Sequence, residues 1–192
     1  MAATVLAEDL RIQRLVDDLL LLLARADEDG LRPNLQPVDV DDLVLDEARR
    51  LRSTAAEVRV STAGVSPARL EADPQGLRRV LRNLGDNAAR HARTRVAFDL
   101  AATGDGRIVL GVEDDGPGVP DGDRERIFER FVRLDDARSR SVEDGGGSGL
   151  GLAIVAELVA AHGGSVTVSQ GALGGARFEV SLPSGEGGPG RP

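Results

Sequence analysis

The sequence contains no cysteine, which excludes disulfide bonds and thiolate metal sites. It also lacks a long hydrophobic run, since the most apolar stretch, residues 19–24, is far shorter than the roughly 20 residues of a membrane-spanning helix. The amino end carries Glu8 and Asp9 and has no basic segment, so it does not have the pattern of a secretory signal peptide. We therefore expect a soluble chain.

Basic residues are outnumbered. The chain has 24 lysines and arginines against 32 aspartates and glutamates, for a formal net charge of −8, and its basic residues are scattered. Proteins that bind nucleic acid by neutralising phosphates need a basic surface, so this charge argues against a nucleic-acid partner while leaving a local phosphate site open. The length of 192 residues and the 41% hydrophobic content suit one globular domain with a small appendage.

Helical periodicity begins near the amino end. Apolar residues recur at spacings of three and four over residues 4–26, and the leucines within this stretch predict a helix that other helices must cover. Gly30, Pro33 and Pro37 then interrupt the pattern, which predicts a linker over residues 27–38.

The rest of the chain mixes helical and strand patterns. Helices are predicted over 41–56, over 74–92 and from 149 to a glycine stop at 163–164. Strands are predicted over 57–61, 68–72, 95–102, 107–114, 165–171 and 176–183. Residues 115–148 show little regular pattern and are long for a loop, which is typical of functional or disordered segments. The glycine-rich residues 184–192 predict a flexible tail.

A polar stripe lies on the predicted helix 74–92. Asn83, Asn87, Arg90 and His91 stand at i, i+4, i+7 and i+8, so they share one helix face. The neighbouring apolar positions are typical of a core. The stripe on its own is consistent with a solvated face.

Two glycine-rich signals follow. The first is the end of a predicted strand at Asp114, Gly116 and Gly118, a pattern that is by default a turn. In the functional alternative, the Asp114 carboxylate accepts a hydrogen bond from an amine, and the glycines let a flat ligand approach the backbone. Gly147 and the residues after it lead into a helix start, where free N–H groups and the helix dipole favour an anion, although a flexible linker has the same composition.

The order of these signals resembles the catalytic ATP-binding domain of sensor histidine kinases, a group related to DNA gyrase and to chaperone and mismatch-repair ATPases. The resemblance covers about residues 39–183 and rests on "NLGDNAARHA", "DDGPGVP", "IFERFVRL" and "GSGLGLAIV". Residues 1–26 resemble the second helix of the dimerisation and phosphotransfer domain. The resemblance implies an α+β fold: a two-layer α/β sandwich of the Bergerat type, with a mixed sheet packed on helices, preceded by one long amino-terminal helix.

The resemblance also implies a site for ATP and Mg²⁺. Asp114 would bind the adenine amine, with Gly116 and Gly118 beside it. Asn87 would ligate Mg²⁺ through its carboxamide oxygen, since Mg²⁺ prefers oxygen ligands and takes further ones from phosphates and water. Asn83, one turn earlier, would support the metal and the phosphates.

Further residues are implied to contact the nucleotide. Arg90 corresponds to a basic position that reaches phosphate, and His91 to a position beside the nucleotide. Arg133 matches a residue associated with the γ-phosphate and, with Asn83, is a candidate catalytic residue. Backbone N–H groups of the last box would close over the phosphates; these residues are Gly147, Gly149, Leu150 and Gly151.

Residues 115–148 would form a lid over the nucleotide, with Phe128 and Phe131 as its apolar anchors. The sequence departs from the family pattern at Gly85, where a helix-interior glycine costs about 0.5 to 1 kcal/mol relative to alanine. Ala176 replaces a frequent threonine on the adenine side. Val132 stands where an aromatic residue is common, and of these departures Ala176 is the one that bears on how the base is held.

Asn83 favours a kinase within the superfamily, because the hydrolytic members generally carry a glutamate there to activate water. Neither His91 nor His162 has the context of a phosphoacceptor, and His162 precedes a glycine stop, where a structural role at a helix end is expected. The resemblance therefore implies that the chain is a fragment of a larger, homodimeric sensor kinase anchored in the membrane, with its catalytic domain in the cytoplasm. Its implied partners are the dimerisation domain of that parent protein and a cognate response regulator. The alternatives are a nucleotide-binding regulatory module and a serine kinase of the anti-sigma type.

Overall fold

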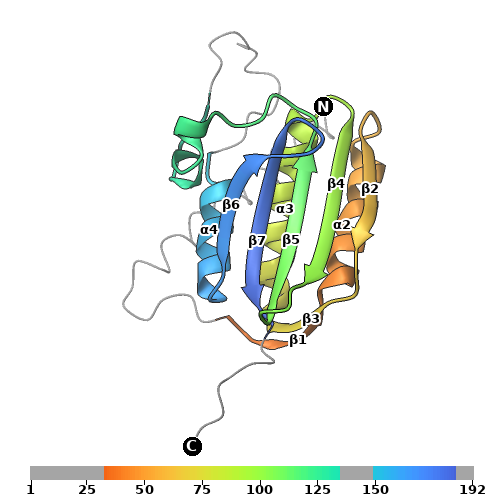
Figure 1. The fold of residues 1–192 in the computed structure, drawn as a ribbon, viewed down its shortest axis with the longest axis vertical. Coiled ribbons are helices and arrows are strands. Elements are labelled where there is room, and N and C mark those ends of the chain that lie inside the picture. The colour runs from red at the N-terminus through yellow and green to blue at the C-terminus, as the bar shows by residue number, and fades with distance from the viewer. Residues whose placement is uncertain (1–32, 135–148, 185–192) are drawn as a thin grey trace, which may run out of the picture.

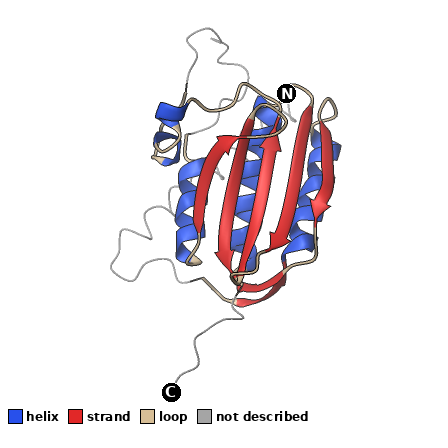
Figure 2. Ribbon diagram, in the orientation of Figure 1, coloured by secondary structure: helices blue, strands red, loops and turns tan. Residues whose placement is uncertain are grey.

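The computed structural model of the chain describes residues 33–134 and 149–184. A five-stranded sheet packs with one face against helices α2, α3 and α4, and a small two-stranded sheet closes one end of the domain (Figures 1 and 2). This arrangement confirms the expected α+β fold with a mixed sheet on helices. The predicted amino-terminal helix, the first half of the predicted linker and nearly all of the predicted tail lie outside the described residues.

Along the chain, each of these three helices is followed by two strands. The helices are α2 (Val40–Thr54), α3 (Pro74–His91) and α4 (Gly151–Ala161), with short 3₁₀ turns η1 (Asp121–Asp123) and η2 (Arg126–Phe128). The strands are β1 (Gln36–Asp39), β2 (Arg59–Val65), β3 (Arg69–Ala72), β4 (Arg95–Ala102), β5 (Arg107–Asp114), β6 (Ser165–Gln170) and β7 (Ala176–Pro183).

The large sheet has the strand order β2-β4-β5-β7-β6. Only β2 and β4 run parallel; the other neighbours are antiparallel, and β4 and β5 form the expected hairpin. Alternate residues of β4 and β7, among them Phe98 and Phe178, are buried in one core shared with the three helices. The period of two in these strands therefore sets which face the helices cover.

Helix α3 carries the candidate site and is fixed at its start. Asp73 caps it by accepting a hydrogen bond from the Gln75 N–H at 2.9 Å, and Pro74 occupies the first turn, where its missing N–H costs nothing. The His162 ring, just after α4, accepts a hydrogen bond from the Asp73 N–H at 3.0 Å and contacts the Leu158 carbonyl at 2.7 Å. His162 thus joins the end of α4 to the start of α3, as its expected structural role requires.

The glycine at position 85 is explained by the side chain that packs against it. A Cβ at this position would lie 2.7 Å from Oε1 of Glu47, a buried residue of α2. Arg50 holds the same carboxylate and also pairs with Asp86 of α3, and the Glu47 hydrogen bond raises the pKa of the Arg50 guanidinium above its usual range. The glycine makes room for this polar contact between α2 and α3.

Strand β1 is the main addition to the predicted elements. Its residues 36–38 fall at the end of the predicted linker, and the strand pairs antiparallel with β3, Val38 opposite Leu70. Both residues are buried, and the small sheet covers the starts of α2 and α3. Boundaries elsewhere differ by a few residues, most clearly at α4, which begins at Gly151.

Candidate functional site

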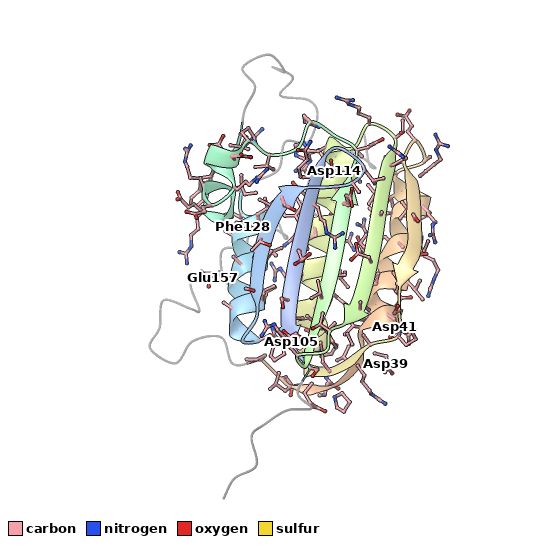
Figure 3. All side chains as sticks on the ribbon, in the orientation of Figure 1. Asp39, Asp41, Asp105, Asp114, Phe128 and Glu157 are labelled. Carbon is pink, nitrogen blue, oxygen red and sulfur yellow. The ribbon has the colours of Figure 1, made fainter. Side chains whose placement is uncertain are left out.

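Three sequence signals meet at one end of the large sheet. Strand β5 ends there at Asp114, α3 ends beside it, α4 begins there, and residues 171–175 between β6 and β7 cross the same edge (Figures 1 and 3). The site is therefore built from segments that are far apart in the sequence.

Asp114 is 1% exposed and only partly satisfied. Its Oδ1 accepts hydrogen bonds from the Gly116 N–H at 2.8 Å and the Ala176 N–H at 3.4 Å. Its Oδ2 is buried without a hydrogen-bond partner among the described residues. Burial raises the pKa of this carboxyl, and the Gly116 hydrogen bond only partly opposes the shift. An orphaned buried acceptor is costly and indicates a donor that arrives with a ligand.

Glycines pack closely around Asp114. A Cβ at Gly175 would lie 2.4 Å from Asp114 Oδ1, and one at Gly116 would lie 2.3 Å from the carbonyl oxygen of His91, at the end of α3. Gly118 has a positive φ of 76°, which glycine adopts without strain. Glycine is therefore required at these positions because the backbone of the 114–118 turn packs directly against the end of α3, the Asp114 carboxyl and Gly175.

The next carboxylate, Asp115, is fully satisfied. It accepts hydrogen bonds from the backbone N–H groups of Arg93, Thr94 and Arg95 and from the Thr94 hydroxyl. These hydrogen bonds, that from the Thr94 N–H most of all, hold the pKa of the Asp115 carboxyl well below its usual range. Asp115 therefore fixes the link from α3 to β4 against the end of β5, a role that the sequence analysis missed.

The polar stripe of α3 faces the start of α4. Asn83 donates from Nδ2 to the Gly151 carbonyl at 3.2 Å, which joins the two helices at the site. Asn87 is half-buried and Arg90 is half-exposed or more, and neither side chain has a hydrogen bond within residues 33–134 and 149–184 that would hold it in place. Partial burial and the neighbouring Arg90 lower the pKa of His91, against the attraction of Asp114, so a neutral imidazole is favoured beside the carboxylate.

The start of α4 has the features of an anion site. Leu150 is its capping residue, with no side-chain cap, and no acidic residue occupies its first turn. Gly149 has a positive φ of 71°, and Gly151 lies beside Asn83. The N–H groups of a first helical turn have no intrahelical partner and sit at the positive end of the dipole. Gly147 lies outside the described residues.

The segment that was expected to form the lid is described from residue 115 to residue 134. Phe128 is partly buried edge-on against Phe178, with ring centroids 6.3 Å apart, and is the apolar anchor that was expected. Phe131 is 67% exposed and has a φ of 65°, and its N–H donates to the Gly149 carbonyl at 3.0 Å. The expectation that Phe131 is also an apolar anchor is wrong: its backbone, and not its ring, makes this contact. Arg133 is exposed.

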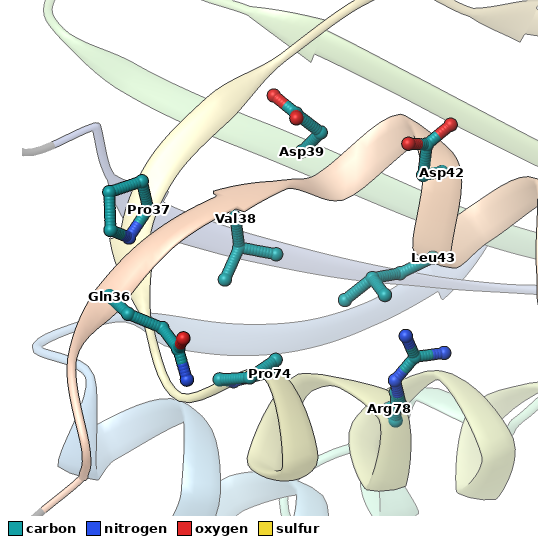
Figure 4. A pocket seen from close by; sticks show the side chains of 8 residues that line it. All are labelled: Gln36, Pro37, Val38, Asp39, Asp42, Leu43, Pro74 and Arg78. Atoms are coloured by element: carbon teal, nitrogen blue, oxygen red, sulfur yellow. The ribbon is translucent and has the colours of Figure 1, made fainter.

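A shallow cavity of about 230 Å³ lies at the β1 end, away from Asp114. Pro37, Asp42 and Arg78 are among its lining residues, which come from β1 and from the starts of α2 and α3 (Figure 4). It shares no residue with the candidate site.

None of the helices in the described part of the chain combines the length and hydropathy that a membrane crossing requires.

Comparison with known proteins gives the site a context. The sequence profile of the family described as histidine kinase-, DNA gyrase B- and HSP90-like ATPases matches residues 72–186. The chain belongs to this family. Within it, curated relatives and a solved structure similar to this chain are named sensor histidine kinases, so the described domain is a catalytic ATP-binding domain of the sensor-kinase type, and the two alternatives are not favoured.

The curated relatives are longer proteins than this chain. A probable sensor histidine kinase of Mycobacterium tuberculosis is 37% identical over 179 residues, which cover 93% of this chain and 45% of the relative. The sensor protein RstB of Escherichia coli is 50% identical over 111 residues, covering 58% of this chain and 25% of the relative. The chain thus spans less than half the length of these relatives.

Solved structures agree with the fold. The mycobacterial sensor histidine kinase MprB superposes with a TM-score of 0.67 at 32% identity, covering 78% of this chain and 97% of that chain. Full-length ShkA, solved in complex with AMPPNP, superposes with a TM-score of 0.69 at 32% identity, covering 92% of this chain and 38% of that chain.

Proposed function

We propose that the chain binds Mg·ATP at the Asp114 end of the sheet and supplies the γ-phosphoryl group to a histidine of a dimerisation domain. The orphaned Oδ2 of Asp114 carries the proposal, because it is a buried acceptor without a partner at the end of a strand, beside a glycine turn. The exocyclic amine of adenine is a donor of the right kind, and Gly116 and Gly118 would lie beside the flat base. The AMPPNP complex of ShkA supports a nucleotide in this fold.

The phosphates would lie between α3 and the start of α4. Arg90 and the N–H groups of Gly149, Leu150 and Gly151 would neutralise them, His91 would border the nucleotide, and Gly147 would add to the same backbone set. The half-buried Asn87 faces this region from the stripe that Asn83 anchors through Gly151.

The residues at the site fit a magnesium ion held largely by the nucleotide. The described residues contain no group of three or more histidine, aspartate or glutamate side chains that could hold a metal alone. Asn87 would supply a carboxamide oxygen, supported by Asn83, and phosphate oxygens and water would supply the rest. When bound, Mg²⁺ neutralises charge on the phosphates.

Phosphoryl transfer needs positioning and charge stabilisation more than covalent chemistry from the protein. Asn83 cannot act as a base toward water, so the bound ATP would be retained until a histidine reaches it. Arg133, on the described part of the lid, would stabilise charge that develops on the transferring group. The parent would be a longer, dimeric, membrane-anchored sensor whose catalytic domain lies in the cytoplasm and whose product is read by a response regulator.

The test uses labelled ATP and the dimerisation domain of the parent protein. The chain alone should bind ATP without labelling itself, because neither His91 nor His162 has the context of a phosphoacceptor and His162 is bonded at both ring nitrogens. Adding the acceptor domain should give acid-labile phosphohistidine on that domain, and Arg133→Ala should slow transfer more than it weakens binding. Bound ATP with an unlabelled acceptor domain would reject the kinase proposal and leave a nucleotide-binding module.

A further inference from the structure

Two consecutive carboxylates of β5 contact one loop from opposite faces of the sheet. Neighbouring strand residues point to opposite faces, so Asp114 faces α3 and Glu113 faces away from the helices. Asp114 accepts from the Ala176 N–H and lies against Gly175. Glu113 accepts a hydrogen bond from the Leu173 N–H. The 171–175 loop is therefore held at its tip by one residue and at its end by the next.

Glu113 is an unusual residue for this face, because its side chain is only 6% exposed. A buried carboxylate is costly unless it is hydrogen-bonded or paired. Its hydrogen bond is the one from Leu173, and the nearest cation, Nη1 of Arg177, is 3.8 Å from its other oxygen. Arg177 itself is held more closely by Asp99, at 2.8 Å between Nη2 and Oδ2. The contact with the loop is thus the main one for Glu113.

The loop has few other means of keeping its position. It is a turn closed by bonds from the Gly171 N–H to the Gly175 carbonyl at 2.9 Å and from the Gly174 N–H to the Gly171 carbonyl at 3.1 Å. Gly171 packs against the Glu113 carboxyl so closely that a Cβ there would lie 2.5 Å from it. A glycine-rich turn offers little side-chain packing, so a single carboxylate at its tip has a large share in fixing it.

We infer that Glu113 is a positioning residue for the adenine side of the site. It holds the 171–175 loop so that Gly175 and the Ala176 N–H fix Oδ1 of Asp114 and leave Oδ2 directed at the base. Glu113 touches no part of the nucleotide in this arrangement; it acts through the loop. The inference rests on the proposed binding of an adenine nucleotide at Asp114.

The test measures ADP and adenosine binding by calorimetry for the whole chain and its variants. Glu113→Ala should weaken both about fivefold to tenfold, the equivalent of one ordinary hydrogen bond, because Glu113 acts on the base only through the loop. Glu113→Gln should stay within about twofold of wild type, since its carboxamide oxygen still accepts from the Leu173 N–H. Glu179→Ala is the matched control: it removes another carboxylate beside Arg177, 3.5 Å from Nη2, on a residue that pairs with Gly111 and Thr167 within the sheet rather than with the loop.

Inorganic tripolyphosphate with Mg²⁺ separates positioning of the base from general loosening. It would occupy the phosphate side alone, so Glu113→Ala should leave the dissociation constant of tripolyphosphate unchanged, once the competition against ADP is corrected for the weaker ADP affinity of the variant. A second variant, Gly171→Ala, places a methyl group against the Glu113 carboxyl and should weaken adenosine binding in the wild-type background. In the Glu113→Ala background it should add little, because the group it meets is gone.

Each outcome decides one proposal. Wild-type protein that binds neither ADP nor adenosine overturns the proposed function together with this inference. Wild-type binding with Glu113→Ala within twofold of it overturns this inference alone, as does equal weakening toward adenosine and tripolyphosphate. If Glu113→Ala does not fold, Gly171→Ala decides: unchanged adenosine affinity in that variant overturns the inference.

Discussion

The base side and the phosphate side of the proposed nucleotide site are built differently. On the base side, Asp114 is buried and backbone N–H groups and glycines fix its position to within contact distance. On the phosphate side, Asn87, Arg90 and Arg133 are half-exposed or exposed side chains on a helix and on the lid. The difference indicates that the site is preorganised for a flat base, while its charged contacts form from side chains that adjust to the phosphates.

Asp114→Asn should break the base side most strongly. Asparagine cannot offer two acceptors, and losing a hydrogen bond to a charged group costs about 1.5 to 3 kcal/mol, or roughly 10- to 100-fold in affinity for ADP. The same change should leave the ligand-free melting temperature equal or higher, because it removes a buried charge whose pKa is raised by burial. Calorimetry and thermal melts measure the two effects.

The control for this variant is Asp105→Asn, in the fully exposed turn between β4 and β5 at the opposite end of the sheet (Figure 3). It should change neither ADP affinity nor melting temperature appreciably. Wild-type ADP affinity in Asp114→Asn would remove Asp114 from the site.

A pair of glycine variants sharpens the comparison. Gly175→Ala forces a methyl group to within 2.4 Å of Asp114 Oδ1, whereas Gly151→Ala places one 3.7 Å from Asn83, an ordinary contact. Overpacking of this kind costs about 1 to 3 kcal/mol, so Gly175→Ala should lower both stability and ADP affinity. Gly151→Ala should keep its stability or gain up to about 1 kcal/mol from helix propensity. Denaturant melts of the two variants check this, and equal losses in both would contradict a rigid base side.

The local features of this fold could be predicted from sequence. Helix α3 was predicted because its apolar residues have helical spacing after Pro74, which is a residue typical of a first helical turn. The β4–β5 hairpin was predicted because two alternating runs flank a short glycine turn. In both cases the information lies within about twenty residues.

Features that depend on distant partners could not be predicted in this way. Strand β1 exists because Val38 pairs opposite Leu70, and a four-residue strand has no pattern of its own. Gly85 is unfavourable by helix propensity alone, and its reason lies on another helix, where Glu47 occupies the space that a side chain at position 85 would need. The local spacing that made Phe131 look like a lid anchor says nothing about its positive φ.

The candidate site divides in the same way. The stripe and the glycine boxes identify residues by type and order, so Asp114 and the α3 residues could be singled out. The supporting residues could not: Asp115 binds the N–H groups of a segment about 20 residues away, and Gly175 lies near Asp114 only because β7 pairs with β5. Adjacent carboxylates with opposite roles look identical in a sequence.

Asn87→Ala tests the phosphate side. It removes one neutral oxygen ligand, a loss of about 1 kcal/mol or roughly fivefold in ADP affinity when Mg²⁺ is present. In EDTA the variant and the wild type should bind ADP alike, and adenosine affinity should not change in either condition. Titrations with and without Mg²⁺ measure this. A loss that persists in EDTA would mean that Asn87 contacts the nucleotide itself.

The smallest expected effect is that of pH on adenosine, which carries no phosphate and so reports on the base side alone. Burial raises the pKa of Asp114 above its ordinary value of 3.8, so the folded domain keeps this proton at pH values where the unfolded chain has lost it. Asp114 therefore lowers the free energy of unfolding as pH rises through that window, and the ionised acceptor is complete only above it. Adenosine affinity should be constant near neutral pH and fall a few-fold on acidification through the raised pKa. His91→Gln should keep this profile although His91 is close enough to interact with Asp114, while the same profile in Asp114→Asn would assign the titration to another group.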